Sequence, residues 1–278
     1  MSRMTLETLA GEYPQLYLDP DVDSQEAYRK VVLQGAEPAT KSLTHYRGAP
    51  ADRLETAETP AGPVRVATLG CRQDFERVMR GLMAAKSGPE AAIPESQGAA
   101  MVTLFNWPRI HAHLAAFDPA ERAAEFKRFT AVKANYIYML VVLSRGPYSH
   151  VDARAMGEAE AVWLEHSDAI RRFHELTHVI CRRRYPDRID AVRDELVADA
   201  VGLWTAYGRY EPEKALRFLG IRDGRYAGGR LGNYTDDPEG QAAAVCAEIE
   251  RMQAIIYRQA AGDPFDLIPA LMEDAPEA

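Results

Sequence analysis

The spacing of apolar residues along the chain predicts helices over most of its length and strands only in the first half. Apolar and polar side chains alternate over 63–70 (PVRVATLG), and 99–105 (AAMVTLF) is a short apolar run, so each segment is expected to form a strand. Helices are expected over 25–33, 73–86, 118–145, 211–219, 238–260 and 263–272. Ser167 and Asp168 could cap a further helix that Pro186 stops, and another is expected over 189–207, ending at Gly208. The expected fold class is therefore α+β and predominantly helical.

The longest of these segments, 118–145, combines a start signal with a broad apolar stripe. Asp118-Pro119-Ala120-Glu121 stands in the order of an N-cap, a first-turn proline and an acidic third residue. The stripe continues to Leu143, and Gly146-Pro147 is a stop signal. We expect one long helix here, packed behind the helix that carries the candidate metal ligands.

A linker-like stretch divides the chain. Residues 87–98 read SGPEAAIPESQG, a run of small, polar and proline residues with no periodicity. The expected organisation is an α+β lobe with an irregular start over 1–98, packed on a mainly helical catalytic domain over 99–278.

Composition and charge narrow the classes of function. The 278 residues are 47% hydrophobic and 27% charged, as is usual for a soluble globular protein. A net charge of −8 argues against nucleic acid as a partner, because phosphate binding needs a basic surface. No apolar run approaches the length of a membrane span, and the first residues lack an apolar signal region. Three cysteines without a CxxC pair agree with a reducing compartment, so we expect a cytoplasmic protein with no membrane partner.

The candidate chemistry lies in the motif His174-Glu175-Leu176-Thr177-His178, an H-E-x-x-H sequence. On a helix, residues four apart lie on the same face, so His174 and His178 can place both imidazoles on one metal ion. Glu175 stands one step round the helix, where a carboxylate can take a proton from metal-bound water. The motif therefore predicts a metal site that supports hydrolysis.

A second predicted helix follows directly and carries two carboxylates on an otherwise small and apolar stripe. Glu195 and Asp199 share this stripe with Val192, Gly202 and Ala206. Carboxylates on such a face are costly to bury without a partner, and a metal ion with its histidine would supply one. The alternative is a pair of surface helices whose charges are solvated.

At these residues the sequence resembles the gluzincin metallopeptidases. HELTH is the form seen in thermolysin-like enzymes, and Glu195-Leu196-Val197-Ala198-Asp199 is similar to the E-x-x-A-D of prenyl-protein and heat-shock membrane proteases. The resemblance implies a zincin-like lobe in which His174, His178 and Glu195 bind zinc. It further implies that Glu175 is the base and that Asp199 supports a ligand histidine.

The resemblance covers only about thirty-five residues, from Arg172 to Ala206, and is shared with a group of uncharacterised bacterial proteins. Glu195 follows His178 sooner than in thermolysin-like enzymes. The extension typical of metzincins is absent, because Cys181 and Arg184 stand where its glycine and third histidine would be.

Three further residues are candidates for substrate contacts. The loop 222–237 carries Arg230 and Tyr234, which could stabilise a developing oxyanion, although so polar a loop is solvent-facing by default. Gluzincins have an exposed strand edge ahead of the metal helix. The strand over 99–105 could be that edge, with Asn106 binding the substrate backbone, or it could be an interior strand.

Three functions are compatible with these residues. The leading hypothesis is a zinc-dependent hydrolase of the peptidase type, which cleaves a peptide or amide bond by Glu175-assisted attack of metal-bound water. Two histidines and a carboxylate also form the triad of non-haem Fe²⁺ oxygenases, with Arg230 then holding a 2-oxoacid. The third is a non-catalytic module, in which a metal staples two helices. The cysteine-free ligand set with a free glutamate favours an open, catalytic site, and no pattern indicates an oligomeric state.

Overall fold

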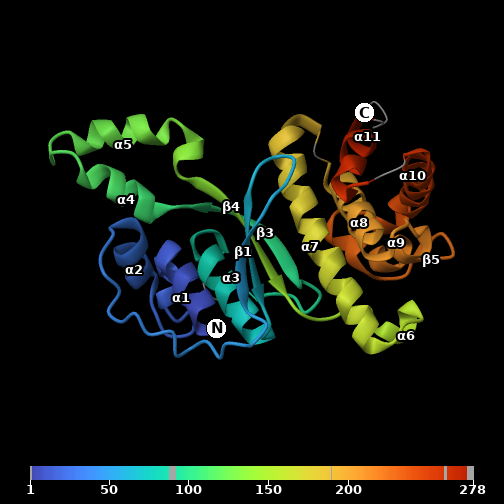
Figure 1. Ribbon diagram of the computed structural model, residues 1–278, viewed down its shortest axis with the longest axis horizontal. Coiled ribbons are helices and arrows are strands. Elements are labelled where there is room, and N and C mark those ends of the chain that lie inside the picture. Colours follow the sequence, from blue (N-terminus) through green and yellow to red (C-terminus); the bar gives the residue numbers. More distant parts are fainter. Residues whose placement is uncertain (1, 88–91, 189, 260–261, 274–278) are drawn as a thin grey trace. The chain divides into compact units, whose positions relative to one another are not determined.

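The computed structural model describes residues 2–87, 92–188, 190–259 and 262–273 (Figure 1). Most of the secondary-structure elements are helices, and the largest sheet has four strands. This confirms the α+β, predominantly helical class. Within the described residues, no helix combines the length and the apolarity needed to cross a membrane.

Contacts divide the chain into two compact units. Unit 1 comprises Met1–Thr56, Arg65–Pro94 and Met101–Ser144. Unit 2 comprises Ala57–Val64, Glu95–Ala100 and Arg145–Ala278. The contacts therefore group the chain differently from the expected division into 1–98 and 99–278, and that division stays a prediction.

Unit 1 is built on a sheet whose strands lie in the order β1-β2-β4-β3. The bounds are β1 (Arg53–Ala57), β2 (Val64–Leu69), β3 (Ala99–Phe105) and β4 (Ile137–Ser144). The inner strands β2 and β4 are parallel and pair from Arg65 opposite Leu140 to Leu69 opposite Ser144. Strands β2 and β3 confirm the two predictions. β3 is an edge strand and not an interior one.

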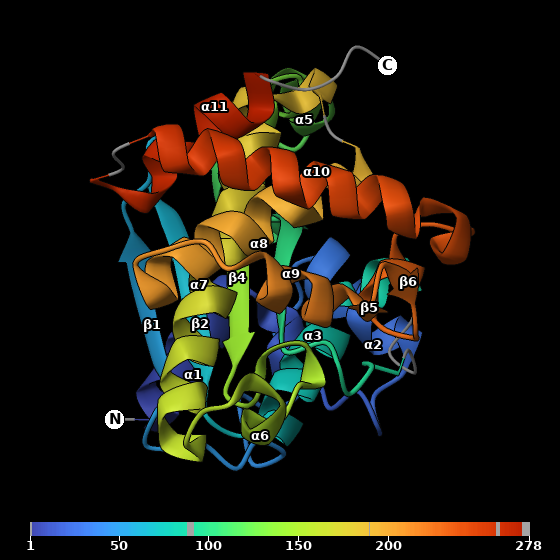
Figure 2. The same ribbon diagram turned by 90° about the vertical axis from the view of Figure 1, so that its right-hand side faces the viewer.

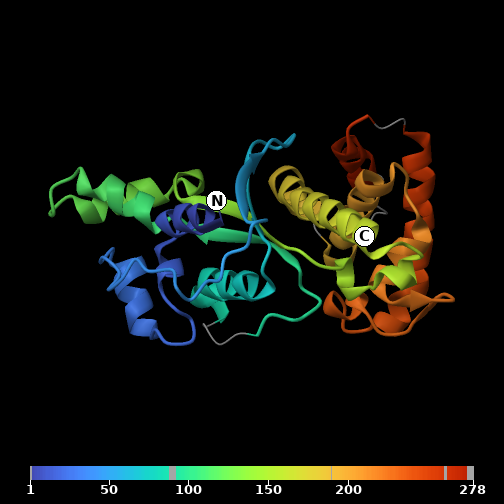
Figure 3. The same ribbon diagram turned by 60° about the horizontal axis from the view of Figure 1, so that its bottom comes forward.

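Unit 1 also contains helices, of which α3 packs against the sheet. Helix α3 lies along one face of the sheet, against β4, with Phe75, Val78 and Met79 fully buried at the helical spacing that the sequence predicted (Figure 3). The helical elements are α1 (Ser2–Glu12), η1 (Pro14–Tyr17), α2 (Gln25–Tyr28), η2 (Arg29–Leu33), α3 (Arg72–Ser87), α4 (Trp107–Ala115), α5 (Arg122–Thr130) and η3 (Lys133–Asn135).

The prediction of one long helix over 118–145 is wrong. Only Arg122–Thr130 is α-helical, and Ile137–Ser144 is the inner strand β4. The segment IYMLVVLS is apolar at almost every position, so it satisfies a helical stripe and a fully buried parallel strand equally well. In the sheet the segment lies between β2 and β3, and this pairing on both edges decides for the strand.

Unit 2 is helical. Its elements are η4 (Tyr148–His150), α6 (Ala153–Met156), α7 (Glu160–Arg184), η5 (Pro186–Arg188), α8 (Ala191–Tyr207), α9 (Pro212–Leu219), β5 (Ile221–Arg222), β6 (Arg225–Tyr226), η6 (Arg230–Asn233), α10 (Pro238–Arg258), η7 (Pro264–Asp266) and α11 (Leu267–Glu273). The long helices α7 and α8 pack side by side, α11 lies beside α8 and α10 beside α9 (Figure 2). The β5–β6 pair is a short antiparallel hairpin.

Helices α7 and α8 approach so closely because Gly202 has no side chain. A Cβ added there would lie 2.8 Å from the backbone oxygen of Ile170. The end of α7 before Pro186 and the end of α8 at Gly208, which has φ of +65°, match the sequence signals. The start of α7 does not, because the helix begins at Glu160, and Ser167 and Asp168 lie inside it.

Candidate metal centre

The structure brings His174, His178 and Glu195 together. The Nε2 atoms of the two histidines are 3.0 Å apart. The Glu195 carboxylate lies 3.3 Å from Nε2 of His174 and 3.4 Å from Nε2 of His178. Ligand atoms of all three residues lie within 4.8 Å of one another, so the group could hold a metal ion. These are the three residues that the sequence predicted as metal ligands, and their role as ligands stays a prediction.

The cluster follows from the packing of two helices. His174 and His178 are one turn apart on α7, and Glu195 comes from the first turns of α8. Both histidines are less than one-tenth exposed, and the apolar residues between them and around Glu195 are core residues. The close approach at Gly202 sets the spacing at which α8 delivers its carboxylates to the imidazoles.

Carboxylates hold the other ring nitrogen of each histidine. Nδ1 of His174 is 2.9 Å from Asp199 Oδ1, and Nδ1 of His178 is 2.8 Å from Asp194 Oδ2. A carboxylate accepts a hydrogen bond, so each Nδ1 carries the proton, and each Nε2 presents its lone pair to the cluster. Asp199 thus has the supporting position that the resemblance implied. Asp194 was not foreseen.

The donors of the cluster fit a cation. Two Nε2 lone pairs that face each other at 3.0 Å repel unless a positive charge lies between them. The Oε2 atom of Glu195 is buried and makes no hydrogen bond within the described residues. A buried acceptor without a donor is costly, and a bound cation would satisfy it.

The charges around the cluster lead to the same conclusion. Asp194, Glu195 and Asp199 are three carboxylates, and Arg230 is the cation paired with Asp199. With neutral imidazoles these four side chains carry a formal charge of minus two, which a divalent cation would balance.

The ionisation of the cluster also favours positive charge at the imidazoles. Burial opposes a charged His178, but hydrogen bonds with Asp194 and Glu195 outweigh it and raise the pKa of this imidazole well above its usual value. Burial likewise opposes a charged Glu195, yet the two histidines hold the pKa of this carboxyl well below its usual range. A proton or a metal ion is therefore stabilised at this place.

Arg230 and Tyr234, the proposed oxyanion partners, both lie at the centre. The Arg230 guanidinium donates to Asp199 and, at 2.6 Å, to the Tyr148 hydroxyl, and its Nη2 is 3.9 Å from Glu195. It also lies 6.0 Å from the centre of the Tyr234 ring. Burial, together with the charge of Glu195, raises the pKa of Tyr234 and outweighs the opposing effect of Arg230. Tyr234 therefore remains a protonated donor.

Tyr148 is the central residue that sequence reasoning missed. Its hydroxyl donates to Asp199 Oδ1 at 2.6 Å and lies 2.8 Å from Nδ1 of His174. Arg171 fixes the preceding turn by donating to the backbone oxygens of Gly146 and Pro147 at 2.9 and 3.2 Å. Gly146-Pro147 was expected only to stop a helix, and no local pattern connects Tyr148 with a motif that begins 26 residues later.

Glu175 is buried beside His174 on α7, turned by about 100° round the helix axis. In the part of the chain that the structure describes, its carboxylate makes no hydrogen bond or ion pair. The Glu175 carboxylate therefore has no structural contact that competes with accepting a proton, and a general base needs this freedom. Its catalytic role stays a prediction.

Asn106 lies in unit 1, at the end of the edge strand β3. Its side chain caps α4 by accepting a hydrogen bond from the Arg109 backbone at 3.0 Å. This contact gives the residue a structural task, and its predicted contact with a substrate stays a prediction. Cys181 is buried next to the cluster, and burial raises the pKa of its thiol to about 12, as expected for a core residue.

Comparison with known proteins gives one family and no function. The profile of a family of unknown function, DUF7005, matches residues 3–262. No curated protein and no solved structure is significantly similar to the chain.

Proposed function

The chain belongs to the DUF7005 family of unknown function, and we propose that it is a zinc-dependent hydrolase that cleaves a peptide or amide bond. One observation carries the proposal. Two imidazole nitrogens and a carboxylate converge, and the other side of each imidazole is held by an acidic residue. Two histidines and one glutamate, with no thiolate, form the ligand set of catalytic rather than structural zinc sites.

His174, His178 and Glu195 would hold the ion. A zinc ion bound there would supply Lewis-acid activation of a water molecule and of the scissile carbonyl group. Asp199 and Asp194 would fix the orientation and tautomer of the two imidazoles and increase their basicity as ligands.

Glu175 would act as the general base. Its buried carboxylate has no competing partner within the described residues, so it is available to accept a proton from the attacking water. The same group would then return this proton to the leaving amine, since amide cleavage needs a protonated leaving group.

Arg230 and Tyr234 would stabilise the oxyanion that develops when water attacks the carbonyl carbon. Arg230 provides a fixed positive charge next to Glu195, and Tyr234 provides a hydroxyl kept protonated by its raised pKa. Groups oriented before the reaction are effective because they need no rearrangement in the transition state.

The test combines metal analysis with one variant. We expect one zinc per chain in protein purified without added metal, and Glu175→Gln should keep that zinc but lose turnover of a fluorogenic peptide mixture. A variant that cleaves as fast as the parent would refute the role of Glu175. Iron together with 2-oxoglutarate binding would favour the oxygenase, and bound zinc without turnover in the parent would favour the non-catalytic module.

A further inference from the structure

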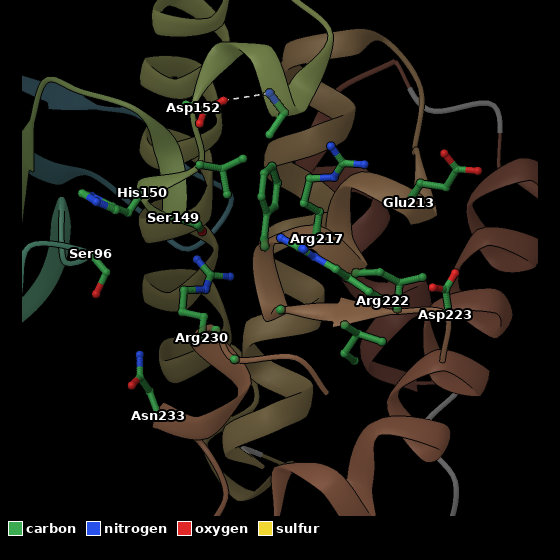
Figure 4. Close-up of a pocket in the computed structure, with 18 residues that line it drawn as sticks. Ser96, Ser149, His150, Asp152, Glu213, Arg217, Arg222, Asp223, Arg230 and Asn233 are labelled. Atoms are coloured by element: carbon green, nitrogen blue, oxygen red, sulfur yellow. Dashed lines mark hydrogen bonds between the residues drawn. The ribbon is translucent and has the colours of Figure 1, made fainter. Parts of the chain in front are cut away.

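A large cavity lies in unit 2, and its wall includes Arg230 of the metal centre (Figure 4). Its volume is about 1060 Å³, which is at the upper end of the range for sites that bind small molecules. The residues that line it come from the segment before β3, at Ser96, and from η4, α6, α9, β5, η6 and the loop that leads to η6. None of the three candidate metal ligands lines the cavity.

The backbone makes one wall of this cavity rigid. A Cβ added to Gly220 would lie 2.3 Å from the backbone oxygen of Gly228, so the two chain segments touch. The backbone of Ala227 donates to the Gly220 oxygen at 2.8 Å and fixes this crossing. A wall fixed in this way keeps its side chains in place without a ligand, which lowers the entropy lost on binding.

Two exposed arginines, Arg217 and Arg222, line the cavity and have no acceptor among the residues that the structure describes. The side chains of Arg217 and Arg222 make no hydrogen bond or ion pair among the described residues. Glu213 precedes Arg217 by one helical turn and also lines the cavity, but the two are not paired. Arginines that line a cavity without a partner carry donors that a ligand can use.

A neutral donor is unsatisfied in the same cavity. The Ser149 hydroxyl is buried and makes no hydrogen bond within the described part of the chain. Arg230 is engaged with Asp199 and Tyr148, but its Nε is likewise buried and without an acceptor. Buried donors are normally paired, so the Ser149 hydroxyl and the Arg230 Nε group both lack an acceptor.

The charged residues around the cavity favour one kind of anionic ligand over another. Figure 4 shows Arg230, Ser149 and His150 on one side of the cavity and Glu213 with Asp223 on the other. Asp152 also lines the cavity, and the three carboxylates of the cavity repel a phosphate dianion more strongly than a monoanion. A carboxylate offers two oxygens that match the planar guanidinium group.

We propose that this cavity binds the carboxylate group of a small molecule, with Arg222 and Arg217 as charged donors and the Ser149 hydroxyl as a neutral donor. Apolar side chains of Val151, Leu216 and Phe218 line the same space and would contact the rest of the ligand. The inference goes beyond the proposed hydrolase function and does not depend on it, because it concerns binding alone.

The test is direct calorimetry on the full chain with acetate, succinate and an N-acetylated alanyl-leucine that ends in a free carboxylate. The same dipeptide with a terminal amide differs only in charge. We expect the carboxylate form to bind and the amide form to bind at least about tenfold more weakly, since a charge-assisted hydrogen bond is lost. Arg222→Gln and Arg217→Gln should each raise Kd for the carboxylate form about tenfold.

Arg225→Gln is the matched control. Arg225 lies opposite Arg222 in the same hairpin and is exposed, as Arg222 is, but it does not line the cavity. Its substitution should leave Kd unchanged, and the circular dichroism of all three variants should match that of the parent.

Three results would overturn the proposal. The first is that none of the three carboxylates binds at millimolar concentration. The second is that the parent and both arginine variants bind the carboxylate dipeptide with equal affinity. The third is that inorganic phosphate binds more tightly than the carboxylates. Each is independent of whether the protein hydrolyses anything.

Discussion

The Nε2 atoms of His174 and His178 face each other at 3.0 Å, while the Nδ1 atom of each ring is held by an aspartate. This relationship determines the chemistry of the site. The two aspartates place the protons on the far side of the rings, so the lone pairs meet where Glu195 also presents its oxygens. The site is therefore prepared for a cation before one binds.

Asp199 should control the affinity for zinc although it would not bind the ion. We expect Asp199→Asn to weaken zinc binding by about 10- to 100-fold, because the His174 imidazole loses its charged partner. Competition with a chromophoric chelator measures this change. Asp187→Asn is the control, since Asp187 is exposed, lies in η5 between the two helices, and is not a member of the cluster. Equal affinities for the two variants would contradict the role of Asp199.

Tyr148 should contribute to stability through its hydroxyl. In Tyr148→Phe the Arg230 Nη1 donor and one Asp199 oxygen each lose a buried partner. The free energy of unfolding should fall by about 1–3 kcal/mol, measured by urea denaturation. Tyr257→Phe, at a side chain that is 64% exposed, should change it by less than about 0.5 kcal/mol. A Tyr148 variant as stable as this control would show that the network is not needed.

Gly202 should be needed for the packing of α7 against α8. Gly202→Ala would place a Cβ 2.8 Å from the Ile170 backbone oxygen, which cannot move away as a side chain could. We expect a loss of about 1–3 kcal/mol in unfolding free energy and weaker zinc binding. In helix α1, Gly11→Ala meets nothing within 4 Å and should be neutral or stabilising by up to about 1 kcal/mol. Two equally stable variants would contradict the account of the helix pair.

Glu158 should make stability depend on pH in the acid range. Burial works against its charge, but hydrogen bonds from Tyr207, His166 and Lys214 lower the pKa of Glu158 below its usual value of 4.5. A carboxyl whose pKa is lower in the folded state stabilises the protein above pH 4.5 and loses this contribution as the pH falls through the lowered pKa.

The parent should therefore lose stability relative to Glu158→Gln as the pH is lowered from above 4.5. Urea midpoints of both proteins over a pH series measure this difference. A difference that stays constant across the series would show that the carboxylate does not provide the expected stabilisation.

The residues of the centre could be predicted from the sequence where both members of a pair lie on the same helix. The histidines are four apart on α7, and Glu195 and Asp199 are four apart on α8, so helical periodicity alone gives their common faces. The two helices are consecutive and joined by a short connection, so their side-by-side packing was also expected.

Tyr148 and Asp194 could not be predicted in the same way. Tyr148 reaches the centre from a short turn between β4 and α6, and its position depends on the packing of Arg171 and Ser167 inside unit 2. Asp194 is an acidic residue in the first turn of a helix, where such residues are common for reasons of the helix dipole. Strand β4 escaped prediction because an almost uniformly apolar segment has no period to read.

Zinc binding by the parent and by His178→Ala tests the central claim most directly. Competition titration of the full chain should give one tightly bound zinc for the parent, and the variant should bind at least about 100-fold more weakly while keeping its helical circular dichroism. Parent and variant that bind zinc with the same affinity, or a parent that binds none, would contradict the metal centre proposed here.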